Sequence, residues 1–297
     1  MSKSAQPSYL ALPESAYRVG ADGDFVVADA ATAPGKHVDS EKALKKRLRQ
    51  QVQQISKLQR KLYADDRFAL LLVFQAMDAA GKDGTIRAVL SGVNPAGCHV
   101  SSFKSPSRNE IEHDYLWRTA CKLPQRGMIG VFNRSYYEEV LAVKVHSRFL
   151  DGQRLPPVDR EGIWQERYES IRDHEQHLHR NGTVVLKFWL NVSREQQKQR
   201  FLSRLTDPEK HWKFSKNDLS ERQHWDSYMD AYQGLLRATS TDMCPWYAIP
   251  ADNKPYMRCC VADVVLQALQ NLPLQYPEQP QEVMDAFASY QQQLDDE

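Results

Sequence analysis

Short apolar runs alternate with amphipathic segments along most of the chain. The runs predict strands at 68–75, 99–103, 128–132, 184–190 and 246–249. The segments between and after them predict helices at 82–90, 109–119, 135–143, 159–180, 194–205, 222–238 and 256–272. Continuous apolar strands separated by helices are typical of a parallel sheet that is covered on both faces. The pattern therefore predicts an α/β protein whose ligands bind beyond the carboxyl ends of the strands.

A longer amphipathic segment precedes the first strand and predicts a helix over 41–63. Its apolar positions recur every three or four residues: Leu44, Leu48, Val52, Ile55, Leu58 and Leu62. The stretch 41–61 also holds eight Lys and Arg residues against Glu41 alone, a net charge of +7. We interpret the basic side as a solvated outer face; the alternative is a guide for a phosphate-rich substrate or nucleic acid. The apolar side packs either within the chain or against another subunit.

The ends of the chain differ from this middle part. Residues 1–38 show no sustained period and predict an irregular arm, whereas 277–297 hold six acidic residues and no Lys or Arg, which predicts a solvated tail. We assign 39–276 to one domain. The whole chain of 297 residues has a net charge of only +1, so a preference for polyanions must come from local clusters. Five cysteines without CxxC spacing, and no long apolar segment, predict a cytoplasmic protein with no membrane partner.

The strongest chemical signal is the segment 69–85, ALLLVFQAMDAAGKDGT. A buried strand that leads through a small-residue loop to Lys82 at a helix start predicts a phosphate cradle. The loop departs from the GxxxxGK[ST] pattern at Ala76 and Asp83. Asp78 lies within the loop, where a carboxylate implies an intervening Mg²⁺ or a proton-accepting role. Thr85 either supplies the hydroxyl that Asp83 lacks or caps the helix.

Two further segments carry candidate chemistry. In 130–140, GVFNRSYYEEV, a strand ends at Asn133, which is a neutral oxygen donor or a helix cap, and Arg134 suits bidentate phosphate contacts. Glu138 orients a nucleotide, holds a metal-bound water, or is simply solvated. The segment 204–222 lies in a stretch (194–222) of net charge +3 and contains Pro208, Trp212 and Phe214. It predicts a mobile lid that brings cations onto a transferring phosphoryl group.

These segments resemble the polyphosphate kinase 2 family of P-loop phosphotransferases. The resemblance covers about 47–276 and rests on QAMDAAGKDGTIR (75–87), the turns in 94–107, HDYLWR (113–118), VFNRSYYEEVL (131–141), DPEKHWKFSKNDL (207–219) and PWYAIPADNK (245–254). It implies a thymidylate-kinase-like three-layer α/β/α sandwich with a five-stranded parallel sheet and a helical lid. It also implies reversible, direct transfer of phosphoryl groups from inorganic polyphosphate to AMP and ADP, giving ADP and ATP. The implied cofactor is Mg²⁺, with Mn²⁺ as an alternative, and guanine nucleotides are further candidate substrates.

The resemblance also implies roles for individual residues. The implied catalytic residues are Asp78, Lys82, Arg134 and Arg204. The implied phosphate-binding residues are Ala79, Ala80, Gly81, Lys82, Asp83, Gly84 and Thr85 of the loop and Lys210, Lys213 and Lys216 of the lid. The implied nucleotide-binding residues are Arg118, Asn133, Tyr137 and Glu138, and the implied metal ligands are Asp78 and Asn133. Asn133 stands where many members carry Asp, and with Glu138 it is similar to the subgroup that accepts both AMP and ADP.

Two other functions compete with this one. An ATP-dependent nucleoside monophosphate kinase is disfavoured by Ala76 and Asp83 in the loop. A nucleic-acid-binding module that uses the basic helix is disfavoured by the interior phosphate loop and the lid. We therefore expect a homo-oligomeric polyphosphate-dependent phosphotransferase that has no nucleic acid partner.

Overall fold

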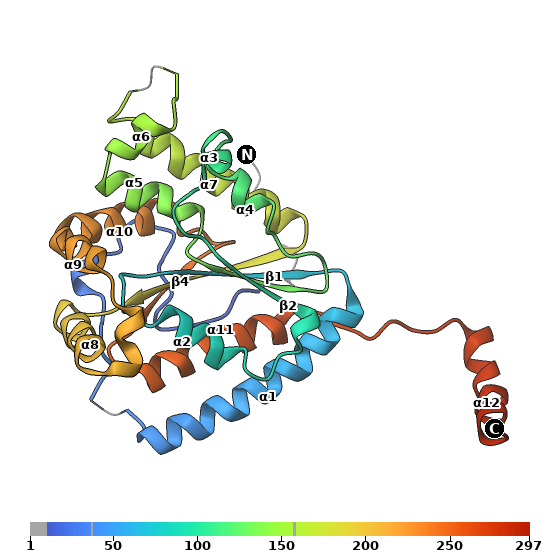
Figure 1. Ribbon diagram of the computed structural model, residues 1–297. Coiled ribbons are helices and arrows are strands. Elements are labelled where there is room, and N and C mark those ends of the chain that lie inside the picture. The colour runs from blue at the N-terminus through green and yellow to red at the C-terminus, as the bar shows by residue number, and fades with distance from the viewer. Residues whose placement is uncertain (1–10, 37, 157–158) are drawn as a thin grey trace.

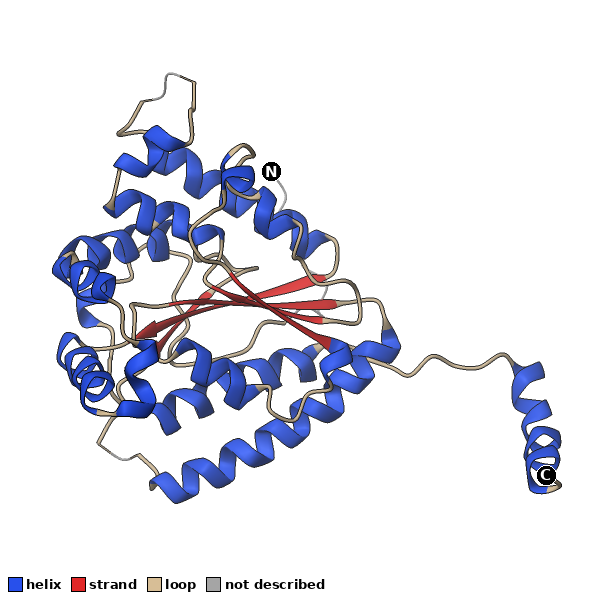
Figure 2. Ribbon diagram, viewed as in Figure 1, coloured by secondary structure: helices blue, strands red, loops and turns tan. Residues whose placement is uncertain are grey.

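A five-stranded parallel sheet forms the centre of the molecule (Figure 2). The computed structural model describes residues 11–36, 38–156 and 159–297. The strands are β1 (Ala69–Gln75), β2 (Cys98–Ser102), β3 (Ile129–Asn133), β4 (Thr183–Asn191) and β5 (Trp246–Pro250), in the order β2-β3-β1-β4-β5. Each lies within two residues of its predicted bounds at either end, and the prediction of a parallel α/β sheet is confirmed.

Helices cover both faces of this sheet, so the fold has three layers (Figure 1). The α-helices are α1 (Glu41–Asp65), α2 (Lys82–Val89), α3 (Arg108–Ile111), α4 (Trp117–Ala120), α5 (Ala142–Val145), α6 (Arg148–Gly152), α7 (Ile163–Arg180), α8 (Arg194–Thr206), α9 (Lys216–Gln223), α10 (Trp225–Thr239), α11 (Lys254–Asn271) and α12 (Gln281–Asp295). Short 3-10 helices are η2 (Val27–Asp29), η3 (Pro95–Gly97), η4 (Tyr136–Val140) and η5 (Pro208–Lys213). One face carries α4, α5, α7 and α10, and the other carries α1, α2 and α11. Among the described residues, no helix has the length and apolar character needed to cross a membrane.

The position of β1 determines where loops from distant parts of the chain meet. All seven residues of β1 are buried, and the strand pairs with β3 on one side and β4 on the other. Parallel pairing brings the carboxyl ends of these three strands to one edge. The loops that follow β1, β3 and β4 therefore lie next to each other, which is where an open parallel sheet binds its ligands.

The apolar stripe of α1 packs within the chain, against α11. Leu44, Ile55 and Leu62 are at most 2% exposed. Ser40 caps the helix by accepting a hydrogen bond from the backbone of Ala43. The basic side of α1 stays on the surface, as predicted, and Arg47 forms an ion pair with Asp263 of α11. The stripe is thus used inside the monomer and is not left for another subunit.

The N-terminal arm lies against the edge strand β5. Of the predicted arm 1–38, residues 1–10 and 37 lie outside the described residues. The rest has little regular structure, but Val19 is buried and donates its backbone N–H to the carbonyl of Trp246 at 2.8 Å. Ala248 donates to the carbonyl of Tyr17 at 2.8 Å. The arm therefore covers an edge that would otherwise expose unpaired backbone groups.

Three predicted segments differ in the structure. The helix predicted at 109–119 is split into α3 and α4, because the Asp114 carboxylate accepts backbone hydrogen bonds from Leu116 and Trp117 and forms a local turn. The helix predicted at 135–143 is the 3-10 helix η4 followed by α5, and its cap is Ser135, not Asn133. The acidic tail contains the helix α12, which the sequence analysis did not predict.

Candidate active site

The loop after β1 forms a tight turn that presents Lys82 at the start of α2. Gly81 has φ of 109° and Ala79 has φ of 61°, both in the left-handed region. The first N–H groups of α2 have no acceptor within the helix and give its N-terminus a partial positive charge. The Lys82 ammonium donates to the carbonyl of Ala76 at 2.9 Å. A loop of this shape, with a lysine at the start of a helix, is able to bind a phosphate group.

A helix that is distant in sequence fixes this loop in place. Gln197 of α8 donates its amide to the carbonyl of Asp78 at 2.9 Å. Arg200, 8% exposed, donates to the carbonyls of Ala79 (3.0 Å) and Ala80 (2.6 Å), and also to the loop after β5. These bonds hold the carbonyl groups of the loop and so restrain its conformation. We did not predict a role for Gln197 or Arg200 from the sequence, although their spacing to Arg204 places all three on one face of α8.

Charged side chains from the segments that follow β1 and β3 meet beside the cradle. The Arg134 guanidinium lies 2.8 Å from the Asp78 carboxylate and 3.8 Å from the Glu138 carboxylate. Arg134 has φ of 63°, an uncommon conformation for a residue other than glycine, and its backbone N–H bonds to the carbonyl of Phe74 on β1. The structure thus brings together Asp78, Lys82, Arg134 and Glu138.

The pKa values in this cluster reflect its charges. Burial lowers the pKa of Lys82, and the nearby Arg134 lowers it further. Burial alone raises the pKa of Asp78, but attraction to Lys82 and Arg134 outweighs it and the net pKa is lowered. Glu138 and Asp78 together raise the pKa of Arg134. Asp78 is therefore an ionised carboxylate held between cations, and its lowered pKa suits charge pairing or metal binding better than accepting a proton.

The donor set fits a divalent cation that arrives with phosphate. Among the described residues there is no group of three or more His, Cys, Asp or Glu side chains suited to hold a metal. Mg²⁺ commonly uses one or two carboxylates and takes its other ligands from substrate phosphates and water. Asn133 offers only a neutral amide oxygen as a ligand, and its amide nitrogen donates to Asp83 at 2.6 Å, whereas Asp78 offers a charged carboxylate. Asp78 is thus the stronger candidate ligand.

The predicted lid comprises the end of α8, η5 and α9. Arg204 donates to the Asp218 carboxylate of α9 at 2.9 Å and to the carbonyl of Lys213 at 3.1 Å. Trp212 is 79% exposed, and the Lys213 ammonium lies 4.9 Å from its ring centre. Lys210 pairs with Asp207 at 2.7 Å. The lid thus presents cations and an uncovered aromatic ring at the surface.

Two sequence-selected side chains do not face the cluster. The Thr85 hydroxyl is fully buried and lies 3.8 Å from the Met257 sulfur of α11, so it does not replace the missing loop hydroxyl. Tyr137 is 0% exposed, and its hydroxyl donates to Glu175 of α7 at 2.8 Å in the core. The assignment of Tyr137 to nucleotide contact is therefore wrong in this structure. Arg118 of α4 donates to the carbonyl of Lys104 at 2.8 Å, and its guanidinium lies 5.5 Å from the ring centre of Phe103.

The buried position of Tyr137 leads to a testable expectation. Tyr137→Phe removes a hydroxyl that donates to Glu175 and accepts from Lys187 at 3.0 Å. We expect the variant to lose about 1–3 kcal/mol of unfolding free energy in urea, with an unchanged KM for nucleotide. A several-fold rise in KM at unchanged stability would instead return Tyr137 to the substrate site.

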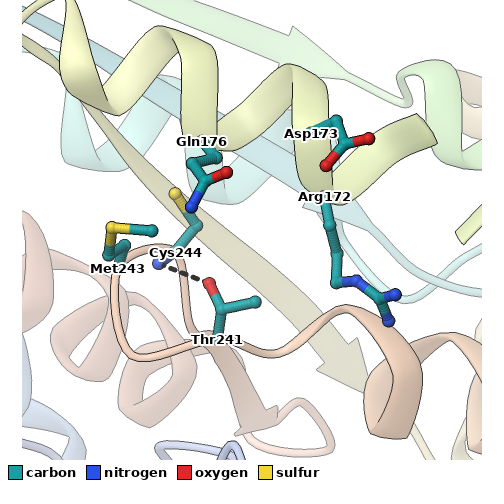
Figure 3. A pocket seen from close by; sticks show the side chains of 6 residues that line it. All are labelled: Arg172, Asp173, Gln176, Thr241, Met243 and Cys244. Atoms are coloured by element: carbon teal, nitrogen blue, oxygen red, sulfur yellow. Dashed lines mark hydrogen bonds between the residues drawn. The ribbon is translucent and has the colours of Figure 1, made fainter. Parts of the chain in front are cut away.

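A small pocket elsewhere has no part in this site (Figure 3). It lies between α7 and the loop before β5, and it is lined by Arg172, Asp173, Gln176, Thr241, Met243 and Cys244. Because that loop leads into the first residue of β5, the pocket is at the amino ends of the strands, opposite the cradle. None of the predicted site residues lines it.

Comparisons with known proteins agree with the fold and with the motifs. The family model described as polyphosphate kinase 2 matches residues 38–277. An ADP-polyphosphate phosphotransferase of Rhodopseudomonas palustris is 56% identical over 78% of this chain and 81% of its own length. An AMP/ADP-polyphosphate phosphotransferase of Meiothermus ruber is 45% identical over 75% of this chain and 80% of its own length. The crystal structure of polyphosphate kinase 2 from Arthrobacter aurescens superposes with a TM-score of 0.82 at 38% identity and covers 89% of this chain and 90% of that one. The chain belongs to the polyphosphate kinase 2 family.

Proposed function

We propose that the protein transfers phosphoryl groups from inorganic polyphosphate to AMP and ADP, giving ADP and ATP, in a reversible and direct reaction. The observation that carries the proposal is the cluster of Lys82, Asp78 and Arg134 at the phosphate cradle, with a cationic lid beside it. One relative is named an ADP-polyphosphate phosphotransferase and the other an AMP/ADP-polyphosphate phosphotransferase, which supports adenine nucleotides as the phosphoryl acceptors. An ATP-dependent monophosphate kinase is the alternative.

The residues divide the work between positioning and charge neutralisation. Lys82 and the N–H groups of α2 hold the phosphate of one substrate. Arg134, fixed by Asp78 and Glu138, reaches the transferring phosphoryl group as a planar, permanently charged donor. Asp78 holds a divalent metal or orients the attacking phosphate oxygen. Phosphoryl transfer depends mainly on such positioning and neutralisation, so no covalent nucleophile is needed.

The lid acts on the polyphosphate chain. Polyphosphate carries about one negative charge per phosphate, so a local cationic surface suffices in a protein of net charge +1. We propose that Arg204, Lys210, Lys213 and Lys216 close over the chain and exclude water. The metal we propose is Mg²⁺, with Mn²⁺ as an alternative, bound through Asp78 and the substrate phosphates.

The remaining assignments are also proposals. All five cysteines are free, which supports a reducing, cytoplasmic location. We propose that the enzyme is a homo-oligomer. Guanine nucleotides are proposed as further acceptors, to be tested beside AMP and ADP.

The decisive experiment supplies phosphate donors separately. Purified protein with Mg²⁺, AMP and polyphosphate, and no ATP, should form ADP first and ATP later. The same protein with AMP and ATP, and no polyphosphate, should produce ADP far more slowly. Phosphorylation of AMP only when ATP is supplied would contradict the proposal and establish the alternative.

A further inference from the structure

The helix α12 carries an apolar stripe that nothing in the structure covers. Figure 1 shows it standing apart from the body, beyond the segment 272–280, and none of its residues is buried. Val283 (36% exposed), Phe287 (47%), Tyr290 (53%) and Leu294 (70%) lie on one side of it. The family match ends at residue 277, so this helix lies outside the part of the chain that the family model describes.

The spacing of the stripe is that of a coiled-coil seam. The four residues follow one another at intervals of four, three and four, which are the a and d positions of a heptad. The positions that flank the seam are Met284, Ala286, Gln291 and Gln293, none of them charged. The acidic residues of the helix, Glu282, Asp285 and Asp295, fall on the outer side. Two such helices can therefore meet without placing like charges in the seam or at its flanks.

Other partners fit this helix less well. An anionic membrane surface attracts Lys and Arg, and residues 277–297 contain neither. The basic face of α1 complements the acidic charge, but most of the apolar stripe of α1 is already buried against α11, so α1 offers no continuous apolar seam to α12. An isolated helix of 15 residues is also only marginally stable in water, so pairing would stabilise α12 itself.

We propose that α12 pairs with α12 of a second copy of this chain, in an antiparallel coiled coil along the seam. The antiparallel direction follows from charge. A parallel pair would place Asp295, Asp296 and Glu297 of both copies side by side. An antiparallel pair separates these clusters and sets each near the N-terminus of the other helix, where it meets the single acidic residue Glu282 and where the backbone dipole favours negative charge. In this arrangement Val283 of one copy faces Leu294 of the other.

Cysteine crosslinking of the full chain tests the pairing. Cys121 is exposed and is first replaced by serine. Val283→Cys and Leu294→Cys variants are mixed and treated with a bis-maleimide shorter than the ~16 Å that separates the two positions along one helix. We expect a crosslinked dimer from the mixture and none from either variant alone. Adding Phe287→Glu to both variants should abolish it.

The matched control uses Glu282→Cys mixed with Asp295→Cys. These positions lie at the same level of an antiparallel pair but face outward, so we expect only background crosslinking. A seam yield no higher than this control would overturn the pairing. Strong crosslinking of Val283→Cys with itself would overturn the antiparallel direction. The readout is a denaturing gel, so the result is independent of which phosphoryl donor the enzyme uses.

Discussion

Lys82→Met is expected to lower kcat for phosphoryl transfer by about 10²–10³-fold. Lys82 begins α2 at the cradle and is 9% exposed, and its charge offsets that of Asp78 and would offset that of a phosphate group. A preorganised donor in a site with little water commonly contributes this much to transition-state stabilisation. The measurement is kcat with saturating polyphosphate and ADP, which separates the chemical step from weaker binding.

Two controls make this result specific. Lys198→Met changes the same residue type on the exposed side of α8 and should retain nearly full activity. The unfolding free energy of Lys82→Met should stay within about 1 kcal/mol, because the variant loses one hydrogen bond to the Ala76 carbonyl. Near-wild-type kcat in a folded Lys82→Met protein would show that Lys82 only supports the loop.

The fold was largely predictable because its signal is local. Each strand is a continuous apolar run, and burial on both faces requires that composition whatever the neighbouring strands are. The prediction of one helix over 109–119 was wrong for an equally local reason. The Asp114 carboxylate forms a turn that the spacing of apolar residues does not reveal. The helix α12 was missed because the acidic composition of the tail outweighed its four-residue seam in our interpretation.

The residues of the candidate site were likewise predictable where the signal is local and were missed where it depends on the fold. Lys82 and Arg134 lie directly after strands, and sequence order alone places such residues at the carboxyl edge of a parallel sheet. Gln197 and Arg200 were missed because they act on a loop about 120 residues earlier in the chain, through contacts that only the fold creates. Tyr137 was misassigned because a tyrosine beside a site motif can point either way, and its hydroxyl here satisfies buried charges.

The buried charges beneath Tyr137 lead to a second prediction, which concerns the free energy of unfolding. Lys187 of β4 and Glu175 of α7 are 0% and 1% exposed and lie 2.6 Å apart. The Lys187 ammonium also donates to the carbonyl of Thr239 at 2.7 Å, and Glu175 accepts from Tyr136 at 2.8 Å. Lys187→Met leaves Glu175 charged and unpaired in the core. We expect a loss of about 3–5 kcal/mol of unfolding free energy, measured in urea.

The cause is tested by removing the second charge. Lys187→Met/Glu175→Gln contains no unpaired ion and keeps an acceptor for the Tyr136 hydroxyl, so it should recover more than half of the loss. Lys198→Met, a solvated lysine, should change stability by less than about 0.5 kcal/mol. If the double variant were as unstable as Lys187→Met, the loss would come from packing around the lysine stem. Recovery would show instead that the loss comes from the charge of Glu175 once its cation is removed. The ion pair would then act by joining α7 to β4 beneath η4. In this way it supports the end of the sheet that presents Arg134.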